Sequence, residues 1–258
     1  MPDPLIALAF GFVVALLTTP VGVSGAVLLL PVQLDILHVP NPSVTPTNLL
    51  YNVVSGPGAL FRHRRTGGLG SPLLRHLLAG TVPGVVIGAC LRVWLVPDPR
   101  PFRFVAALVL LPMGAWLVTR TMRRPSAVAA APFRPRTLIL LALAVGVVGG
   151  IYGIGGGSLL APLLVGRGMK VAEVAPAALA STFVTSVVGA VAFTVLAVGV
   201  DGSIAPDWVV GIAAGLGGLV GGYCGARWSR FAPERALRLL LGVLAIALAV
   251  VYVVLALR

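Results

Sequence analysis

The stretch YGIGGGSLLAP, Tyr152 to Pro162, decides how this chain folds and functions. It has four glycines between positions 153 and 157 and closes on a proline. Two kinds of glycine-rich turn bind nucleotides, the dinucleotide-binding motif and the P-loop, and this stretch matches the spacing of neither. Ser158 stands where a dinucleotide motif has its third glycine, and no lysine follows as a P-loop requires. We therefore reject a nucleotide phosphate as its ligand.

The composition around this stretch is that of a membrane protein. Of 258 residues, 58% are hydrophobic and 10% are charged, whereas a soluble domain is roughly 45–50% apolar. A helix needs about 20 apolar residues to cross the hydrocarbon core. Continuous runs of that size occupy 73–96, 101–119, 174–199, 207–226 and 236–256. They lack the alternation of a barrel strand, so we predict an all-α polytopic protein of the inner (plasma) membrane.

The net charge of +12 is carried mainly by arginine. Arginines cluster between apolar runs, as in RHRRTGG (62–68) and TRTMRRP (119–125). Such clusters set membrane topology and meet anionic lipid headgroups, so we expect lipid contacts and no nucleic acid. Cys90 and Cys224 lie inside apolar runs and are too few for a four-ligand metal site. We expect neither a metal nor a cofactor.

An internal duplication surrounds the opening stretch. A shift of 131 residues superposes VGVSGAVLLLP (21–31) on YGIGGGSLLAP (152–162). A shift of 134 superposes TNLLYNVVSG (47–56) on STFVTSVVGA (181–190), and GVVIGACLRVW (84–94) on GLVGGYCGARW (218–228). We predict two transmembrane repeats, 1–120 and 137–258, joined by a cytoplasmic linker rich in Arg, Pro and Ala at 121–136.

The loop charges predict that the two repeats are inverted in the membrane. Arg62 and Arg64 follow the second apolar run of the first repeat, whereas the matching loop of the second repeat contains Asp201 and Asp207. Because Lys and Arg favour the cytoplasmic side, these loops should lie on opposite sides. Each repeat must then cross the membrane an odd number of times.

An odd number of crossings requires the first apolar block of each repeat to begin and end on the same side of the membrane. The blocks 5–37 and 138–165 are too short for two comfortable spans, and three clear spans follow each of them. We predict a broken or re-entrant hairpin plus three transmembrane helices in each repeat, about eight apolar segments in all. The glycine–proline motifs form the hairpin tips. Paired interrupted segments of this kind indicate the binding site of a secondary transporter.

The candidate substrate-binding residues are small, polar and grouped at the tips. A helix that restarts after a glycine turn offers free N–H groups to an anion. Thr47 and Ser181 are placed where the next helix begins, and Asn52 and Ser186 follow one turn later on the same face. The full set is Ser24, Gly25, Thr47, Asn48, Asn52, Gly155, Gly156, Gly157, Ser158, Ser181, Thr182 and Ser186.

Other interpretations of the same residues stay open. Glycines in membrane helices commonly serve close helix packing, and Thr47 or Ser181 could simply cap a helix. Gln33 and Asp35 are polar residues at the end of an apolar run. For Asp35, a water-facing helix end is favoured over a role in ion coupling.

Two other functions were weighed against transport. The sequence GVSG (22–25) matches the short nucleophile motif of intramembrane rhomboid proteases, so a serine hydrolase that uses Ser24 is one alternative. A nucleophilic serine needs a base within hydrogen-bond reach, and the three histidines lie at or near predicted loops. The second alternative is a membrane scaffold or assembly protein, which needs no paired broken helices.

The paired motifs resemble the sulfite exporter TauE/SafE family, also called the toluene sulfonate uptake permease family. The likeness is carried by GIGGGSLLAP, its weaker twin GVSGAVLLLP, the Thr-Asn and Ser-Thr pairs, and GGYCGARW, and it extends over nearly all of 5–256. It implies a transporter, not an enzyme, of small sulfur-containing or other organic anions such as sulfite, sulfonates or sulfoacetate-like compounds. A coupling proton or sodium ion is a further expectation.

Overall fold

The computed structural model is helical throughout the residues that it describes, which are 3–64, 71–95, 99–123, 133–167, 169–198, 204–229 and 231–257. Those ranges contain ten α-helices and no strand. They are α1 (Pro4–Thr18), α2 (Ala26–Pro31), α3 (Asn41–Arg64), α4 (Pro72–Trp94), α5 (Pro99–Met122), α6 (Pro135–Tyr152), α7 (Gly156–Gly166), α8 (Val171–Ala197), α9 (Trp208–Trp228) and α10 (Glu234–Leu257).

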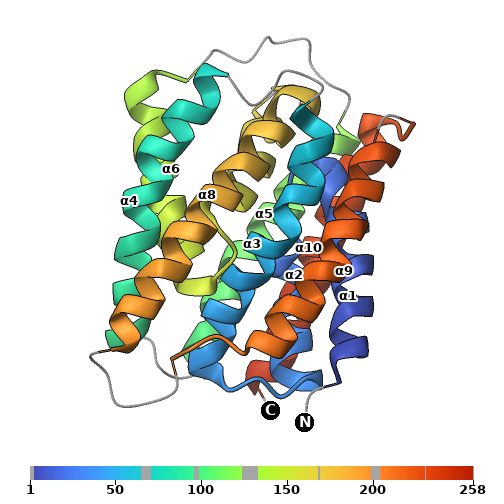
Figure 1. The fold of residues 1–258 in the computed structure, drawn as a ribbon. Coiled ribbons are helices and arrows are strands. Elements are labelled where there is room, and N and C mark those ends of the chain that lie inside the picture. Colours follow the sequence, from blue (N-terminus) through green and yellow to red (C-terminus); the bar gives the residue numbers. More distant parts are fainter. Residues whose placement is uncertain are drawn as a thin grey trace.

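Five stretches among the described residues are long and apolar enough to cross a membrane. They are α1 with the turn that follows it (Pro4–Val21), α4, α6, α8 and α9. The predicted all-helical, multi-pass class is confirmed at this level. Both chain ends lie at the same end of the helix bundle (Figure 1).

The long helices form two groups, each with a common direction. Gly217 and Gly225 of α9 meet Leu8 and Leu16 of α1 in that order, so these helices are parallel. Contacts of the same kind make α3 parallel to α9, and they make α4, α6 and α8 parallel to one another.

The two groups run in opposite directions. Leu49 of α3 meets Gly189 of α8, and Gly56 meets Phe183, so residue numbers rise along one helix as they fall along the other. The remaining long pair, α5 and α10, is also antiparallel. Figure 1 shows α8 descending across the bundle beside α3. The first helix of each half of the chain therefore packs along the fourth helix of the other half.

Glycines let these helices approach each other closely. A Cβ built on Gly84 of α4 would lie 2.5 Å from the carbonyl oxygen of Leu143 in α6. Small residues that bring backbones together are a typical interface of membrane helices, where packing supplies the association energy. The packing role of glycines, left open above, therefore applies along these helices.

Two neighbouring glycines of α9 allow a matched test of this packing. We expect Gly221→Ala to lower the free energy of unfolding by about 1–3 kcal/mol, because its Cβ would overlap the Phe12 carbonyl. Gly222→Ala is the control, since the atom nearest to a Cβ at this position, Thr19 Oγ1, would be 3.4 Å away, an ordinary van der Waals distance. Thermal denaturation of the purified proteins in detergent measures both. Equal stability of the two variants would contradict this packing.

Both predicted blocks are broken at their glycine motifs. After α1 a 3₁₀ turn (Thr19–Val21) leads to Gly22, whose φ is +77°; after α6 the chain turns at Gly153, whose φ is +68°. These left-handed conformations favour glycine. The second arms, α2 and α7, are short, and α2 continues as a π-helical turn (Val32–Ile36).

The two arms of each block differ in length: α1 and α6 have 15 and 18 residues, whereas α2 and α7 have 6 and 11. The first arms reach spanning length because they begin before the apolar run: Asp3 caps α1 by accepting a hydrogen bond from the Leu5 N–H, and α6 begins at Pro135. The expected number of about eight apolar segments counts each block as one. Since each block contributes two helices, the described residues form ten helices.

Candidate functional site

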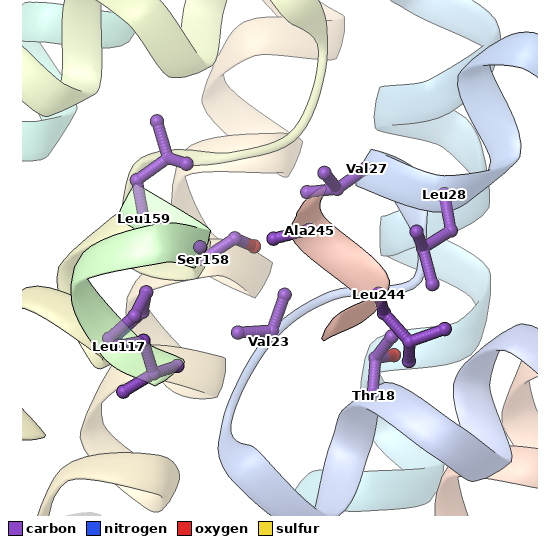
Figure 2. Close-up of a pocket in the computed structure, with 11 residues that line it drawn as sticks. Thr18, Val23, Val27, Leu28, Leu117, Ser158, Leu159, Leu244 and Ala245 are labelled. Atoms are coloured by element: carbon purple, nitrogen blue, oxygen red, sulfur yellow. The ribbon is translucent and has the colours of Figure 1, made fainter. Parts of the chain in front are cut away.

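The two glycine motifs meet inside the bundle. The Ser24 N–H, in the first break, donates a hydrogen bond of 3.2 Å to Ser158 Oγ, in the first turn of α7. Figure 2 shows Val23 and Ser158 close together, each on its own broken segment. Residues 134 positions apart in the chain are thereby in direct contact.

Helix α3 holds the first break. The Ser24 hydroxyl donates to Asn52 Oδ1 and accepts from the Ala26 N–H at 3.1 Å. The Nδ2 of Asn52 donates to the Gly153 carbonyl at 3.3 Å, so this one side chain links both breaks. One turn earlier on α3, Asn48 Nδ2 donates to the Ala26 carbonyl at 3.1 Å.

Helix α8 holds the second break with hydroxyl groups. The Gly156 N–H donates to Thr185 Oγ1 at 3.2 Å, and Ser158 Oγ lies 3.2 Å from Thr182 Oγ1. Ser181 shares a hydrogen bond of 3.0 Å with Thr81 of α4, whose methyl group packs against Gly156. The start of α7 is therefore surrounded by neutral donors and acceptors.

Two buried polar atoms in this region have no hydrogen-bond partner among the residues that the structure describes. They are Oδ1 of Asn48 and Oγ of Ser186, and both side chains are 0% exposed. Buried polar groups are nearly always paired. Ser186 Oγ lies 3.1 Å from the position that a Cβ on Gly155 would take, so it faces the turn that begins α7.

The structure brings the predicted residues together with one exception. Thr47 is directed away: its hydroxyl donates to the Ser43 carbonyl at 2.6 Å and accepts from the Asp207 N–H, at the start of α9, at 2.8 Å. The residues that gather at the two breaks are Ser24, Gly25, Asn48, Asn52, Gly155, Gly156, Gly157, Ser158, Ser181, Thr182 and Ser186.

The expected helix starts at Thr47 and Ser181 are wrong. Helix α3 begins at Asn41 and α8 at Val171, so both residues lie inside helices and neither caps one. Both helices continue through a proline that precedes the expected start, Pro46 in α3 and Pro176 in α8. Each proline removes one backbone hydrogen bond in its helix but does not end it.

Several polar residues of this region were missed. Arg92 of α4, which the candidate set does not include, is 3% exposed and donates to the Asn41 carbonyl at 2.9 Å, to Asn41 Oδ1 at 2.8 Å and to Thr45 Oγ1 at 3.1 Å. Thr45 in turn donates to the Ile151 carbonyl, just before the second break. The available signal was the position of Arg92 inside the apolar run 73–96.

Gln33 is a further buried polar residue. It lies in the π-helical turn after α2 and is 0% exposed, while Asp35 in the same turn is half-buried. Its side-chain nitrogen and oxygen have no partner among the described residues. π-Helical turns are frequent at functional sites.

Two small cavities flank the contact between the breaks, each of about 30 Å³. One has polar groups from Ser24, Asn52 and Thr182 in its wall. The other, drawn in Figure 2, is mainly apolar, with the Ser158 hydroxyl pointing into it. Spaces of this size hold water but not an organic sulfonate, so the site is closed in this conformation.

The partner of Ser24 bears on the hydrolase alternative. Its hydroxyl donates to the carboxamide of Asn52 and not to an imidazole. An amide oxygen is not a base that can activate a serine, so the arrangement lacks the nucleophile–base pair of hydrolysis.

Comparison with known proteins gives one family. The family model described as Sulfite exporter TauE/SafE matches residues 7–252, nearly the whole chain. No curated protein and no solved structure gives a match.

Proposed function

Since the chain belongs to the sulfite exporter TauE/SafE family, we propose that it is a secondary active transporter of small sulfur-containing or organic anions, working by alternating access in the inner membrane. Sulfite, sulfonates and sulfoacetate-like compounds are the proposed substrates. The observation that carries this proposal is the meeting of two broken segments at Ser24 and Ser158, inside a bundle of membrane helices. Broken helices at corresponding positions of two halves are typical of transporter sites.

The anion is proposed to bind at the start of α7. A helix N-terminus carries about half a positive charge, and its first N–H groups lack helical partners. Helix α7 has eleven residues, and the buried Ser186 hydroxyl faces its first turn. Helix α2 has six residues before the backbone widens at Val32, so the second break is the better anion site.

The helix directions support inverted repeats at 1–120 and 137–258. Each matched pair of long helices, α1 with α6, α3 with α8, α4 with α9 and α5 with α10, runs in opposite directions. The carbonyls of Leu8, Phe12 and Leu16 that face α9 match those of Ile139, Leu143 and Val147 that face α4, 131 residues later. The glycines that face these carbonyls are 137 residues apart, Gly80, Gly84 and Gly88 in α4 and Gly217, Gly221 and Gly225 in α9. The two shifts differ by six residues, so the symmetry is approximate.

The distribution of charge supports an orientation. All exposed Lys and Arg side chains that the structure describes lie at one end of the bundle, opposite the chain termini; they are Arg75, Arg120, Arg123, Arg134, Arg136, Arg167, Lys170, Arg227 and Arg235. By the positive-inside rule this end is cytoplasmic, next to anionic lipid headgroups. Asp3 and Asp207 lie at the other end.

Cysteine labelling tests this orientation. With Cys90 and Cys224 replaced by serine, we expect Arg136→Cys to react with a membrane-impermeant maleimide only after the membrane is opened. Ala205→Cys, at the opposite end, should react in intact cells. Both positions are exposed. Labelling of both from the same side would overturn this orientation.

Flux measurements test transport itself. Purified protein in liposomes is expected to take up labelled sulfite faster than protein-free liposomes, and unlabelled sulfonates should compete. Imposed pH or sodium gradients identify the coupling ion, for which a proton or sodium is proposed. Failure to move any of sulfite, taurine, sulfoacetate or acetate, with or without gradients, would contradict the proposal.

A further inference from the structure

The side-chain amide of Asn48 has one paired and one unpaired polar atom, and its hydrogen bond shows which is which. Its Nδ2 donates to the Ala26 carbonyl at 3.1 Å. A carbonyl accepts hydrogen bonds and cannot donate them, so the orientation of the amide follows from this contact. The atom left without a partner is therefore Oδ1.

An amide oxygen only accepts hydrogen bonds. An anionic oxygen placed against it would meet a like partial charge, and both would stay unpaired in a dry interior, at a cost of about 1–3 kcal/mol for each group. A ligand that satisfies Asn48 Oδ1 must instead present an O–H or N–H group.

The unpaired group on α8 has the opposite capacity. The Ser186 hydroxyl can donate, and it faces the turn at Gly155 that precedes the positive end of α7. The positions that match Asn48 and Ser186 by the 134-residue shift are Thr182 and Asn52. Both use their side chains in hydrogen bonds, Thr182 to the second break and Asn52 to both breaks. One half of the chain thus leaves a free acceptor, and the other leaves a free donor.

Both groups border the same turn. The Cβ of Asn48 lies 3.0 Å from the position of a Cβ on Gly153, and Ser186 Oγ lies 3.1 Å from that on Gly155. Gly153 and Gly155 are two residues apart, on either side of Ile154. A ligand bound at this turn would therefore lie beside both Asn48 and Ser186, in a conformation more open than this one, because neither residue lines the two cavities described above.

Resting on the proposed function, we infer that the site selects anions that carry a hydrogen-bond donor of their own. Asn48 Oδ1 accepts the donor, while Ser186 and the α7 N-terminus hold the anionic oxygens. The preferred class is hydroxy- and amino-sulfonates, together with sulfite in its protonated form, hydrogen sulfite. Asn48 is then a specificity-determining residue of the site.

A matched pair of ligands tests this inference by binding. Hydroxyethanesulfonate and ethanesulfonate share one skeleton and differ by a hydroxyl group. We expect hydroxyethanesulfonate to raise the melting temperature of the purified protein at concentrations at least about tenfold lower, since one buried hydrogen bond separates the two ligands. Equal effects of the two ligands, or no effect of either, would overturn the inference.

Two variants separate the roles of the two side chains. Asn48→Leu removes the acceptor and should abolish the preference between the ligands, whereas Ser186→Ala should weaken both ligands alike and keep the preference. Persistence of the preference in a folded Asn48→Leu protein would refute the role of Asn48. Binding with the expected preference but without any flux in liposomes would instead contradict the proposed transport and leave the binding inference standing.

Discussion

Gly155→Ala is expected to lower the initial rate of labelled sulfite uptake by about a hundredfold or more, a loss of the size that follows when binding groups are displaced by about 1 Å. Gly155 combines a φ of +69° with a ψ of 147°, a conformation that is essentially restricted to glycine. Its Cβ would also lie 2.7 Å from Thr182 Cγ2 and 3.1 Å from Ser186 Oγ. The turn must shift to relieve both contacts, and the start of α7 shifts with it.

The matched control is Gly222→Ala. It makes the same chemical change in α9, where the nearest atom would be 3.4 Å away, so uptake should stay close to the wild-type rate. Rates are compared at equal amounts of protein that elutes as a single folded species in detergent. A Gly155→Ala protein that is folded and transports at the wild-type rate would remove the second break from the mechanism.

Arg92→Met is expected to lower the free energy of unfolding by about 1.5–3 kcal/mol, the contribution of hydrogen bonds made by a charged group. The substitution keeps much of the apolar stem but removes the hydrogen bonds that the guanidinium donates to Asn41 and Thr45. The buried Thr45 hydroxyl then loses this donor, which costs more than the bond itself contributes. The contact between the end of α4 and the start of α3 should loosen first.

Arg227→Ala serves as the control for this change. Arg227 occupies the last turn of α9, as Arg92 does in α4, but its side chain is exposed. Surface substitutions usually change stability by less than about 0.5 kcal/mol. Unfolding of both variants in mixed detergent micelles gives the comparison. An Arg92→Met protein as stable as Arg227→Ala would show that the arginine is not a structural tie.

The helical class and the breaks could be predicted because both are local properties of the sequence. Apolar runs of spanning length indicate membrane helices, and the glycines of the two motifs mark the turns where Gly22, Gly153 and Gly155 adopt positive φ. The duplication also predicted that Ser24, Asn52 and Ser186 belong to one substrate-binding site. The structure gathers these at the breaks.

The missed features depend on partners far away in the chain. Arg92 is buried because Asn41 and Thr45, about 50 residues earlier, receive its hydrogen bonds. Thr47 is turned from the breaks by Asp207, 160 residues later. Neither composition nor periodicity contains such pairings, because the crossing of α3 with α4 and α9 is set by packing of whole helices.

Counterflow of labelled sulfite in liposomes tests the central claim, alternating exposure of one anion site between two broken segments, most directly. Unlabelled sulfite trapped inside is predicted to accelerate entry of labelled sulfite through the wild-type protein. The acceleration should vanish in Gly155→Ala and persist in Gly222→Ala. Entry that matches protein-free liposomes, or equal counterflow in both variants, would contradict the account.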